Sequence, residues 1–216
     1  MEIRKELLNG AKSEEQSKLI KYAPLIIGVL LGVISAVVGK LPRMVAQFSG
    51  MTVIGNHVGY LLGALLIAYL NSQKWRRSFI LSSLTIIIAS AVYYFLILIM
   101  RILGIGNTEN LIMMATGLIF WSCVGIVCGA LAATAAKLMT KSKSKLIRQG
   151  TLFATYLALL VVVYLFHVRL IINIYGGLER MVARHIIHIP IGGIAEVVFA
   201  VTLLTMLWIV SMRKIN

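Results

Sequence analysis

The sequence predicts an all-α membrane protein, built as a bundle of six transmembrane helices. Of the 216 residues, 60% are apolar and only 13% are charged, and the mean hydropathy is +0.94. A soluble domain of this size needs many more polar residues on its surface. Apolar runs of about 20 residues recur along the chain, which is the length that a helix needs to cross a bilayer. Helices are expected because each one satisfies its own backbone hydrogen bonds in lipid.

Six apolar segments follow one another, and each is expected to form one helix. The segments are 23–39, 55–70, 79–100, 111–136, 151–167 and 194–212. The second is the shortest, and its helix has room to begin earlier, near Met51. The first follows a tail of mixed charge and lacks a clear small-residue cleavage site, so we expect a retained anchor. The chain then divides into an N-terminal tail (1–22), a membrane domain (23–212) and a C-terminal tail (213–216).

The basic residues predict which side of the membrane each connection faces. The net charge is +14, from 21 Lys and Arg against 7 acidic residues, all of which are Glu. Fifteen of the cations lie in segments that would share one side (1–22, 71–78, 137–150 and 213–216), and six lie on the other side. Because cytoplasmic loops carry an excess of Lys and Arg, both termini are expected in the cytoplasm. The cations separate apolar segments instead of forming one patch, which argues against a nucleic-acid partner and favours contact with lipid headgroups.

Glycine recurs at every fourth position in three of the predicted helices. The glycines are Gly28 and Gly32 in the first, Gly55, Gly59 and Gly63 in the second, and Gly125 and Gly129 in the fourth. Small residues at this spacing form a shallow stripe, against which a neighbouring helix backbone can pack closely. We therefore expect these three helices to lie at the centre of the bundle, or their stripes to pack against another subunit.

Titratable residues gather on the predicted outer side. Glu196 lies just inside the last apolar segment, where an acid costs up to a few kcal/mol unless it has a partner. One interpretation is a proton- or cation-binding carboxylate; the other is an interfacial Glu that the helix dipole stabilises. Nearby basic residues could neutralise Glu196, and His57 also maps to the outer side. The candidate substrate- or ion-binding residues are Glu196, His185, His188, Arg184, Arg180 and His57.

His185 and His188 are three residues apart, so on a helix they would share one face. With Glu196 they could complete a set of two His and one carboxylate for zinc or iron. Pro190 and the glycine pair at 192–193 interrupt that geometry. The sequence therefore predicts no metal site and no cofactor.

The sequence lacks the catalytic and nucleotide-binding motifs that would indicate an enzyme. It contains no Asp, which excludes the aspartate-rich motifs of phosphatidyltransferases and prenyltransferases and the paired aspartates of intramembrane proteases. No G-x-S-x-G, H-E-x-x-H or G-x-x-x-x-G-K-[ST] pattern occurs. We therefore expect no enzymatic activity, and any ATP hydrolysis would have to come from a separate chain.

Several local patterns resemble those of a family of small six-span bacterial membrane proteins. They are the run 28–32, the segment 56–72, the loop 74–77 with the sequence Lys-Trp-Arg-Arg, the pair Tyr93-Tyr94, and the stripe of Trp121, Gly125 and Gly129. The resemblance covers roughly the first four predicted helices. It implies a bundle of six spans and no known activity.

Two functions from different classes fit these observations. The first is a transport component, meaning a small permease or the membrane subunit of a complex with a separate ATPase. The second is an accessory or immunity-type membrane protein that binds a partner in the bilayer, because no charge is placed near the predicted midplane. An enzyme with an outer His/Glu site is a further alternative. The expected surroundings are the lipid bilayer of the cell membrane and another membrane subunit or ATPase.

Overall fold

All the regular secondary structure in the described part of the chain is helical. A computed structural model describes residues 22–38, 40, 54, 55, 57–104, 111–163 and 188–215. Within these ranges there are six helices and no strand. The helices are Tyr22–Val38, α4 (His57–Leu70), α5 (Trp75–Ile102), α6 (Leu111–Lys141), α7 (Lys145–Val163) and α10 (His188–Ile215). The predicted all-α class is therefore confirmed, and each helix overlaps one predicted apolar segment.

The helices extend past the apolar segments at one end of the bundle. α5 begins at Trp75 rather than at residue 79, and α6 continues to Lys141 rather than ending at residue 136. α7 begins at Lys145 rather than at residue 151. Lys, Arg and Gln are good helix formers, so the helix continues where the hydropathy falls. The apolar run therefore marked the hydrophobic part of each helix and not the whole helix.

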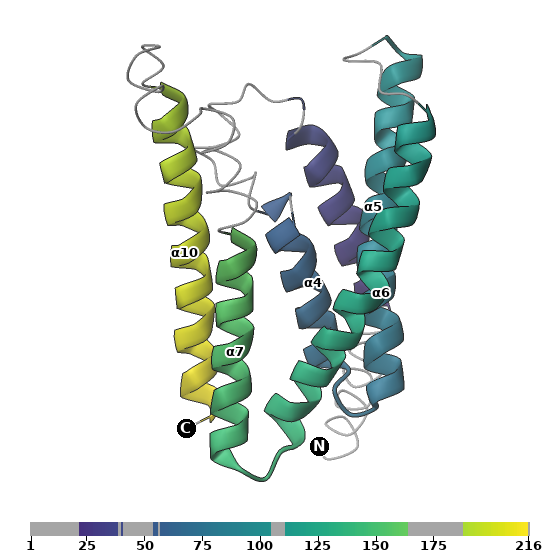
Figure 1. Cartoon of the computed structure of the whole chain (residues 1–216). Helices are drawn as coiled ribbons and strands as arrows, with labels where there is room; N and C mark the ends of the chain where they lie inside the picture. The colour runs from purple at the N-terminus through teal and green to yellow at the C-terminus, as the bar shows by residue number, and fades with distance from the viewer. Residues whose placement is uncertain are drawn as a thin grey trace, which may run out of the picture.

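Neighbouring helices run in alternating directions, as Figure 1 shows. The α4–α5 turn, the α6–α7 turn and the C-terminal end of α10 lie at the lower end in this view. Asn71 closes α4 there, because its side-chain amide donates to the Ile67 carbonyl at 3.0 Å. Ser144 begins α7, because its hydroxyl accepts from the Ile147 N–H at 3.4 Å, as N-cap residues do. The connections rich in Lys and Arg therefore share one end of the bundle.

α5 is the helix against which the glycines of the helix Tyr22–Val38 and of α6 pack. A side chain at Gly28 would lie 2.9 Å from the Thr85 carbonyl oxygen, and one at Gly32 would lie 2.5 Å from the Ala89 carbonyl oxygen. On the α6 side, Gly125 faces Ile86. α5 itself contains no glycine, so the expectation that the glycine-bearing helices are central missed the helix that they share.

Gly129 of α6 also packs against α5, where a side chain at this position would overlap Ser83. Gly63 of α4 faces Leu31 and Ile27 of the helix Tyr22–Val38. These contacts place the helix Tyr22–Val38, α4, α5 and α6 in one packed group.

α7 and α10 form a second, aliphatic contact. Leu159 and Val163 of α7 are buried against Ala200 and Leu204 of α10, together with Val58 of α4. The Tyr156 hydroxyl lies 3.1 Å from the Thr205 hydroxyl across the same interface. The pair is therefore joined to the rest of the bundle through α4 and through the contact of α7 with α6.

Three of the described helices, α5, α6 and α7, are long and apolar enough to cross a membrane. Their outer faces are apolar as well: Phe95 is 61% exposed, Leu131 67% and Ile112 72%. α4 has only 14 residues. It therefore rises about 21 Å, which is less than the roughly 30 Å thickness of a bilayer hydrocarbon core.

Candidate functional site: a polar cluster at the interior start of α4

α4 begins inside the bundle and not at its upper end. His57 is the first residue of α4, and its ring lies 4.7 Å from the Trp121 ring, inclined by 47°. Trp121 is ten residues beyond the first residue of α6, which corresponds to about 15 Å along the helix axis. Figure 1 shows the same relation, since α4 starts near mid-height while α5 and α6 continue upward. The first turn of α4 therefore lies in the interior.

Hydrogen bonds from two helices hold the chain where α4 begins. The Ser35 hydroxyl donates to the Gly55 carbonyl oxygen, and the Tyr60 hydroxyl donates to the Ser35 oxygen at 2.9 Å. A side chain at Gly59 would overlap the Ile54 carbonyl, so its absence lets the preceding turn lie against α4. Ser35 is 8% exposed, so this chain of hydroxyls is part of the interior.

Aromatic residues of three helices surround this region. The Trp121 ring on α6 lies against the His57 ring, and Gly117 lies one turn away on the same face of α6. The Tyr94 hydroxyl of α5 occupies the space that a side chain at Gly117 would need. Tyr93 and Tyr94 of α5 form an edge-to-face pair at 5.0 Å. The start of α4 is therefore bounded by hydroxyl-bearing and indole rings.

A stripe of buried hydroxyls continues from the aromatic cluster along α5. Ser78 donates to the Ala68 carbonyl of α4 at 3.0 Å. Ser82 lies 3.1 Å from the Gly129 carbonyl of α6 and 2.7 Å from the Ser78 carbonyl. Thr85 donates to the Leu81 carbonyl at 2.8 Å. Because residues 78, 82 and 85 follow the helical repeat, their hydroxyls lie along one face.

Two further hydroxyls of α5, those of Ser83 and Ser90, are buried without a hydrogen-bond partner among the described residues. Ser83 is 6% exposed and Ser90 is 2% exposed. A buried hydroxyl without a partner costs free energy, and native proteins usually satisfy such a group with water or a ligand. These two oxygen atoms are therefore the positions of α5 where a bound water or solute would gain most.

The cluster has the chemistry of a hydrogen-bonding site. The first turn of a helix presents backbone N–H groups that lack a partner within the helix, and it carries a partial positive charge. Hydroxyls add groups that both donate and accept. Among the described residues no three His, Cys, Asp or Glu lie together, and Cys123 and Cys128 of α6 are free thiols. The arrangement suits a polar group that is neutral or negatively charged.

His57 is the only sequence-predicted ligand residue whose side chain the structure describes. It lies at the interior start of α4, deeper than the outer position expected for it. His188 and Glu196 belong to the first part of α10, and their side chains lie outside the described residues. Arg180, Arg184 and His185 also lie outside the described residues.

The hydroxyls of α5 and the link between Ser35 and Tyr60 were not predicted from the sequence. The spacing of Ser78, Ser82 and Thr85 could have revealed the stripe, because a polar face inside an otherwise apolar span is directed to the interior. The link between Ser35 and Tyr60 joins two helices, so the spacing of residues within one helix cannot predict it.

No protein-family model, no curated protein and no solved structure matches this chain significantly. The resemblance to a family of small bacterial membrane proteins therefore stays a prediction. What is established is the class of structure: an all-helical bundle in which three of the described helices are long and apolar enough to cross a membrane.

Proposed function

We propose that the chain is a multi-pass protein of the cell membrane, with six crossings and both termini in the cytoplasm. The alternating directions of the helices and the shared end of the basic connections support this placement. The distribution of side chains supports it too, because Phe95 and Leu131 are exposed while Ser82 and Ser90 are buried. In this placement α4 is a broken span whose helix begins within the hydrocarbon layer.

Within that placement, we propose that the protein is a transport component, either a small permease or the membrane subunit of a transport complex. Helices that begin within the membrane are typical of transporters, where their N-termini bind polar or anionic groups of the substrate. The hydroxyls of Ser35 and Tyr60 lie beside the first turns of α4.

The observation that carries this proposal is the pair of buried hydroxyls on α5 without a partner, Ser83 and Ser90. Both lie on the helix that the other three members of the packed group share. Residues 83 and 90 are seven apart and lie along one face of α5, about a third of a turn from the face of Ser78, Ser82 and Thr85. A polar solute moving along α5 on the side of α6 would meet the hydroxyls of Ser83 and Ser90. Energy from ATP would require a separate ATPase chain as a partner.

Cysteine accessibility tests whether water reaches this face of α5. In a background in which Cys123 and Cys128 are replaced by Ala, we would introduce Ser83→Cys and Ser90→Cys separately and apply a membrane-impermeant thiol reagent to proteoliposomes. Because only a hydrated thiol ionises and reacts readily, both positions should react at least about tenfold faster than a lipid-facing thiol. A solute that uses the path should slow the reaction.

Leu84→Cys is the matched control, because Leu84 follows Ser83 on α5 and is 41% exposed on the outer face. Its thiol should remain unreactive in lipid, as should that of Phe95→Cys, since Phe95 is 61% exposed. If Ser83→Cys and Ser90→Cys react as slowly as Leu84→Cys, no aqueous path runs along α5 and the transport proposal fails.

A second candidate function is a non-transporting accessory protein that binds a partner within the bilayer. One observation favours it: between Arg77 and Arg101, α5 has no charged residue, and between Leu111 and Ala136, α6 has none. Carriers of ions usually place ionisable groups near the midplane. Gentle purification separates the two functions, because a stoichiometric ATPase partner would favour transport and a single non-ATPase membrane partner would favour the accessory function.

A further inference from the structure

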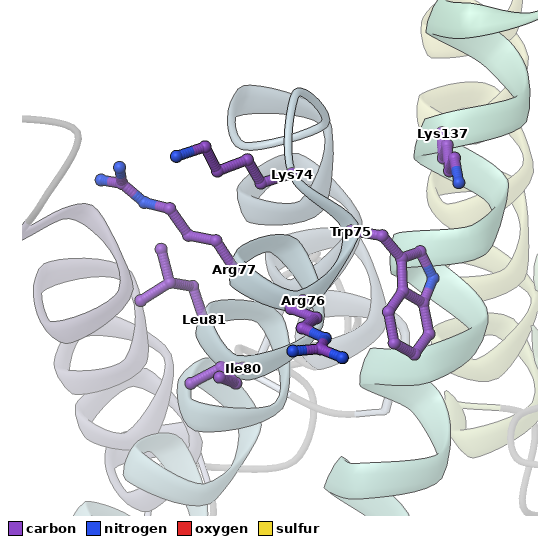
Figure 2. A pocket seen from close by; sticks show the side chains of 7 residues that line it. All are labelled: Lys74, Trp75, Arg76, Arg77, Ile80, Leu81 and Lys137. Carbon is purple, nitrogen blue, oxygen red and sulfur yellow. The ribbon is translucent and has the colours of Figure 1, made fainter.

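A pocket lies at the basic end of the bundle, where α5 begins beside α6. It is open to the outside and has a volume of about 690 Å³. Figure 2 shows its lining: Lys74, Trp75, Arg76, Arg77, Ile80, Leu81 and Lys137. Lys74 and Arg77 extend to the same side of α5, whereas Trp75 lies toward α6, which carries Lys137. Two helices therefore contribute to one pocket.

Four of the seven lining residues are cations, and none is an acid. Glu196, in the first half of α10, is the only acidic residue within the described ranges. The first turn of α5 contains no acidic residue, and the N-cap residue, Lys74, makes no side-chain cap hydrogen bond. The helix N-terminus thus adds N–H donors and a partial positive charge to the four side chains. The pocket is complementary to an anion.

The rest of the lining is apolar and lies along the outer face of α5. Trp75 is held at the rim, because its Nε1–H donates to the Thr134 hydroxyl at 3.2 Å and its ring stacks on Phe79 at 5.5 Å. Ile80 is 59% exposed one turn further along the helix. Trp is enriched where a membrane meets water, and Ile80 continues toward the hydrocarbon. The pocket therefore has a cationic end and an apolar end.

We infer that this pocket binds an anionic phospholipid of the cytoplasmic leaflet. The phosphate would lie beside Lys74 and Arg77, with Arg76 and Lys137 adding positive charge further along the lining, and an acyl chain would lie on Ile80 and Leu81. A free phosphate would use the cations but not the apolar residues, whereas a phospholipid uses both. The inference rests on the membrane placement proposed above, and it does not depend on transport.

Tryptophan quenching by brominated lipids tests this site in the full chain. The chain has three tryptophans, so the double variant Trp121→Phe/Trp208→Phe leaves Trp75 as the single reporter. In vesicles of neutral phosphatidylcholine we would titrate chain-brominated phosphatidylglycerol and, separately, chain-brominated phosphatidylcholine. Phosphatidylglycerol should quench Trp75 at a clearly lower mole fraction. Replacing Arg76 and Arg77 by Gln should lower this preference about fivefold for each cation, or about 1 kcal/mol each.

Lys143→Gln/Lys145→Gln is the matched control, because it removes the same charge from the α6–α7 connection and the first residue of α7, outside the pocket lining. It should change the preference less than about twofold at physiological salt, where distant exposed charges are screened. Arg76→Lys/Arg77→Lys keeps the charge and should keep most of the preference, which separates loss of the site from loss of the fold.

Three results would overturn the site. They are equal quenching by both lipids, an equal loss of the phosphatidylglycerol preference in the pocket and control variants, and displacement of the lipid by millimolar inorganic phosphate. Strong quenching by both lipids without a preference would contradict the phospholipid site but would agree with the proposed placement of the chain in the membrane. Absence of quenching by either lipid would remove the placement as well.

Discussion

The packed group around α5 and the α7–α10 pair have interiors of different composition. Around α5 the buried residues are mostly Ser, Thr, Ala and Gly, among them Ser82, Ala89 and Gly129. Between α7 and α10 they are mostly aliphatic, as Leu159 and Leu204 show. In lipid an aliphatic interface gains little over contact with acyl chains, whereas small and hydroxylated residues allow close backbone approach and hydrogen bonds. The polar chemistry of the described bundle is therefore concentrated around α5.

The largest effect is expected where helix backbones approach most closely. In Gly32→Ala, the added methyl group would lie 2.5 Å from the Ala89 carbonyl oxygen and 2.7 Å from the Val92 Cβ. Because backbone atoms cannot turn away as a flexible side chain does, the helices must separate, at a cost of about 2 kcal/mol. Chemical unfolding in mixed micelles would measure this loss in the free energy of unfolding.

Gly150→Ala in α7 is the control for Gly32→Ala, because nothing lies within 4 Å of the position that its added methyl group would take. It should raise the free energy of unfolding by about 0.5 kcal/mol, since Ala is the better helix former. Equal responses of the two variants would contradict the close packing of the helix Tyr22–Val38 on α5.

An intermediate effect is expected for the aliphatic pair. Leu204→Ala removes a side chain that is 2% exposed between α10 and α7. In lipid only the lost packing counts, so the free energy of unfolding should fall by about 1 to 2 kcal/mol. Leu207→Ala on the same helix, where Leu207 is 44% exposed, should have almost no effect. A loss of about 4 kcal/mol, as in water-soluble cores, would contradict the placement of this pair in lipid.

The helices could be predicted from the sequence because each carries its own signal. A long apolar run identifies a helix such as α6 without reference to its neighbours. The helix ends were harder to predict, since α6 ends at Lys141 and α7 begins at Lys145, and both residues lie outside the apolar runs. α4 begins at His57, within two residues of the start predicted from hydropathy. The Ser35 hydroxyl of another helix donates to the Gly55 carbonyl just before it, and hydropathy does not reveal such a contact.

The candidate site was harder to predict than the fold. Charged residues and histidines predicted a binding site within residues 180–196, because ionisable groups near lipid are costly and are usually kept for a function. The hydroxyls of Ser83 and Ser90 cost less, and Ser is common in membrane helices, so each one carries little signal alone. Only the packing shows that they are buried beside α6 and the other helices without a partner among the described residues. His57 is the one predicted ligand residue, among those whose side chains are described, that the structure brings into the cluster.

The smallest effect is expected for the hydrogen bond that joins α7 and α10. The Tyr156 and Thr205 hydroxyls are 3.1 Å apart, and such bonds between membrane helices average about 0.6 kcal/mol. A double-mutant cycle of Tyr156→Phe and Thr205→Val isolates this coupling from the packing of the ring. A coupling near 0.6 kcal/mol would mean that this hydrogen bond contributes to the stability of an otherwise aliphatic interface. A coupling of zero would mean that packing alone holds α7 against α10. The α5–α4 interface would then differ from it in kind, because Ser78 of α5 donates a hydrogen bond to the backbone of α4.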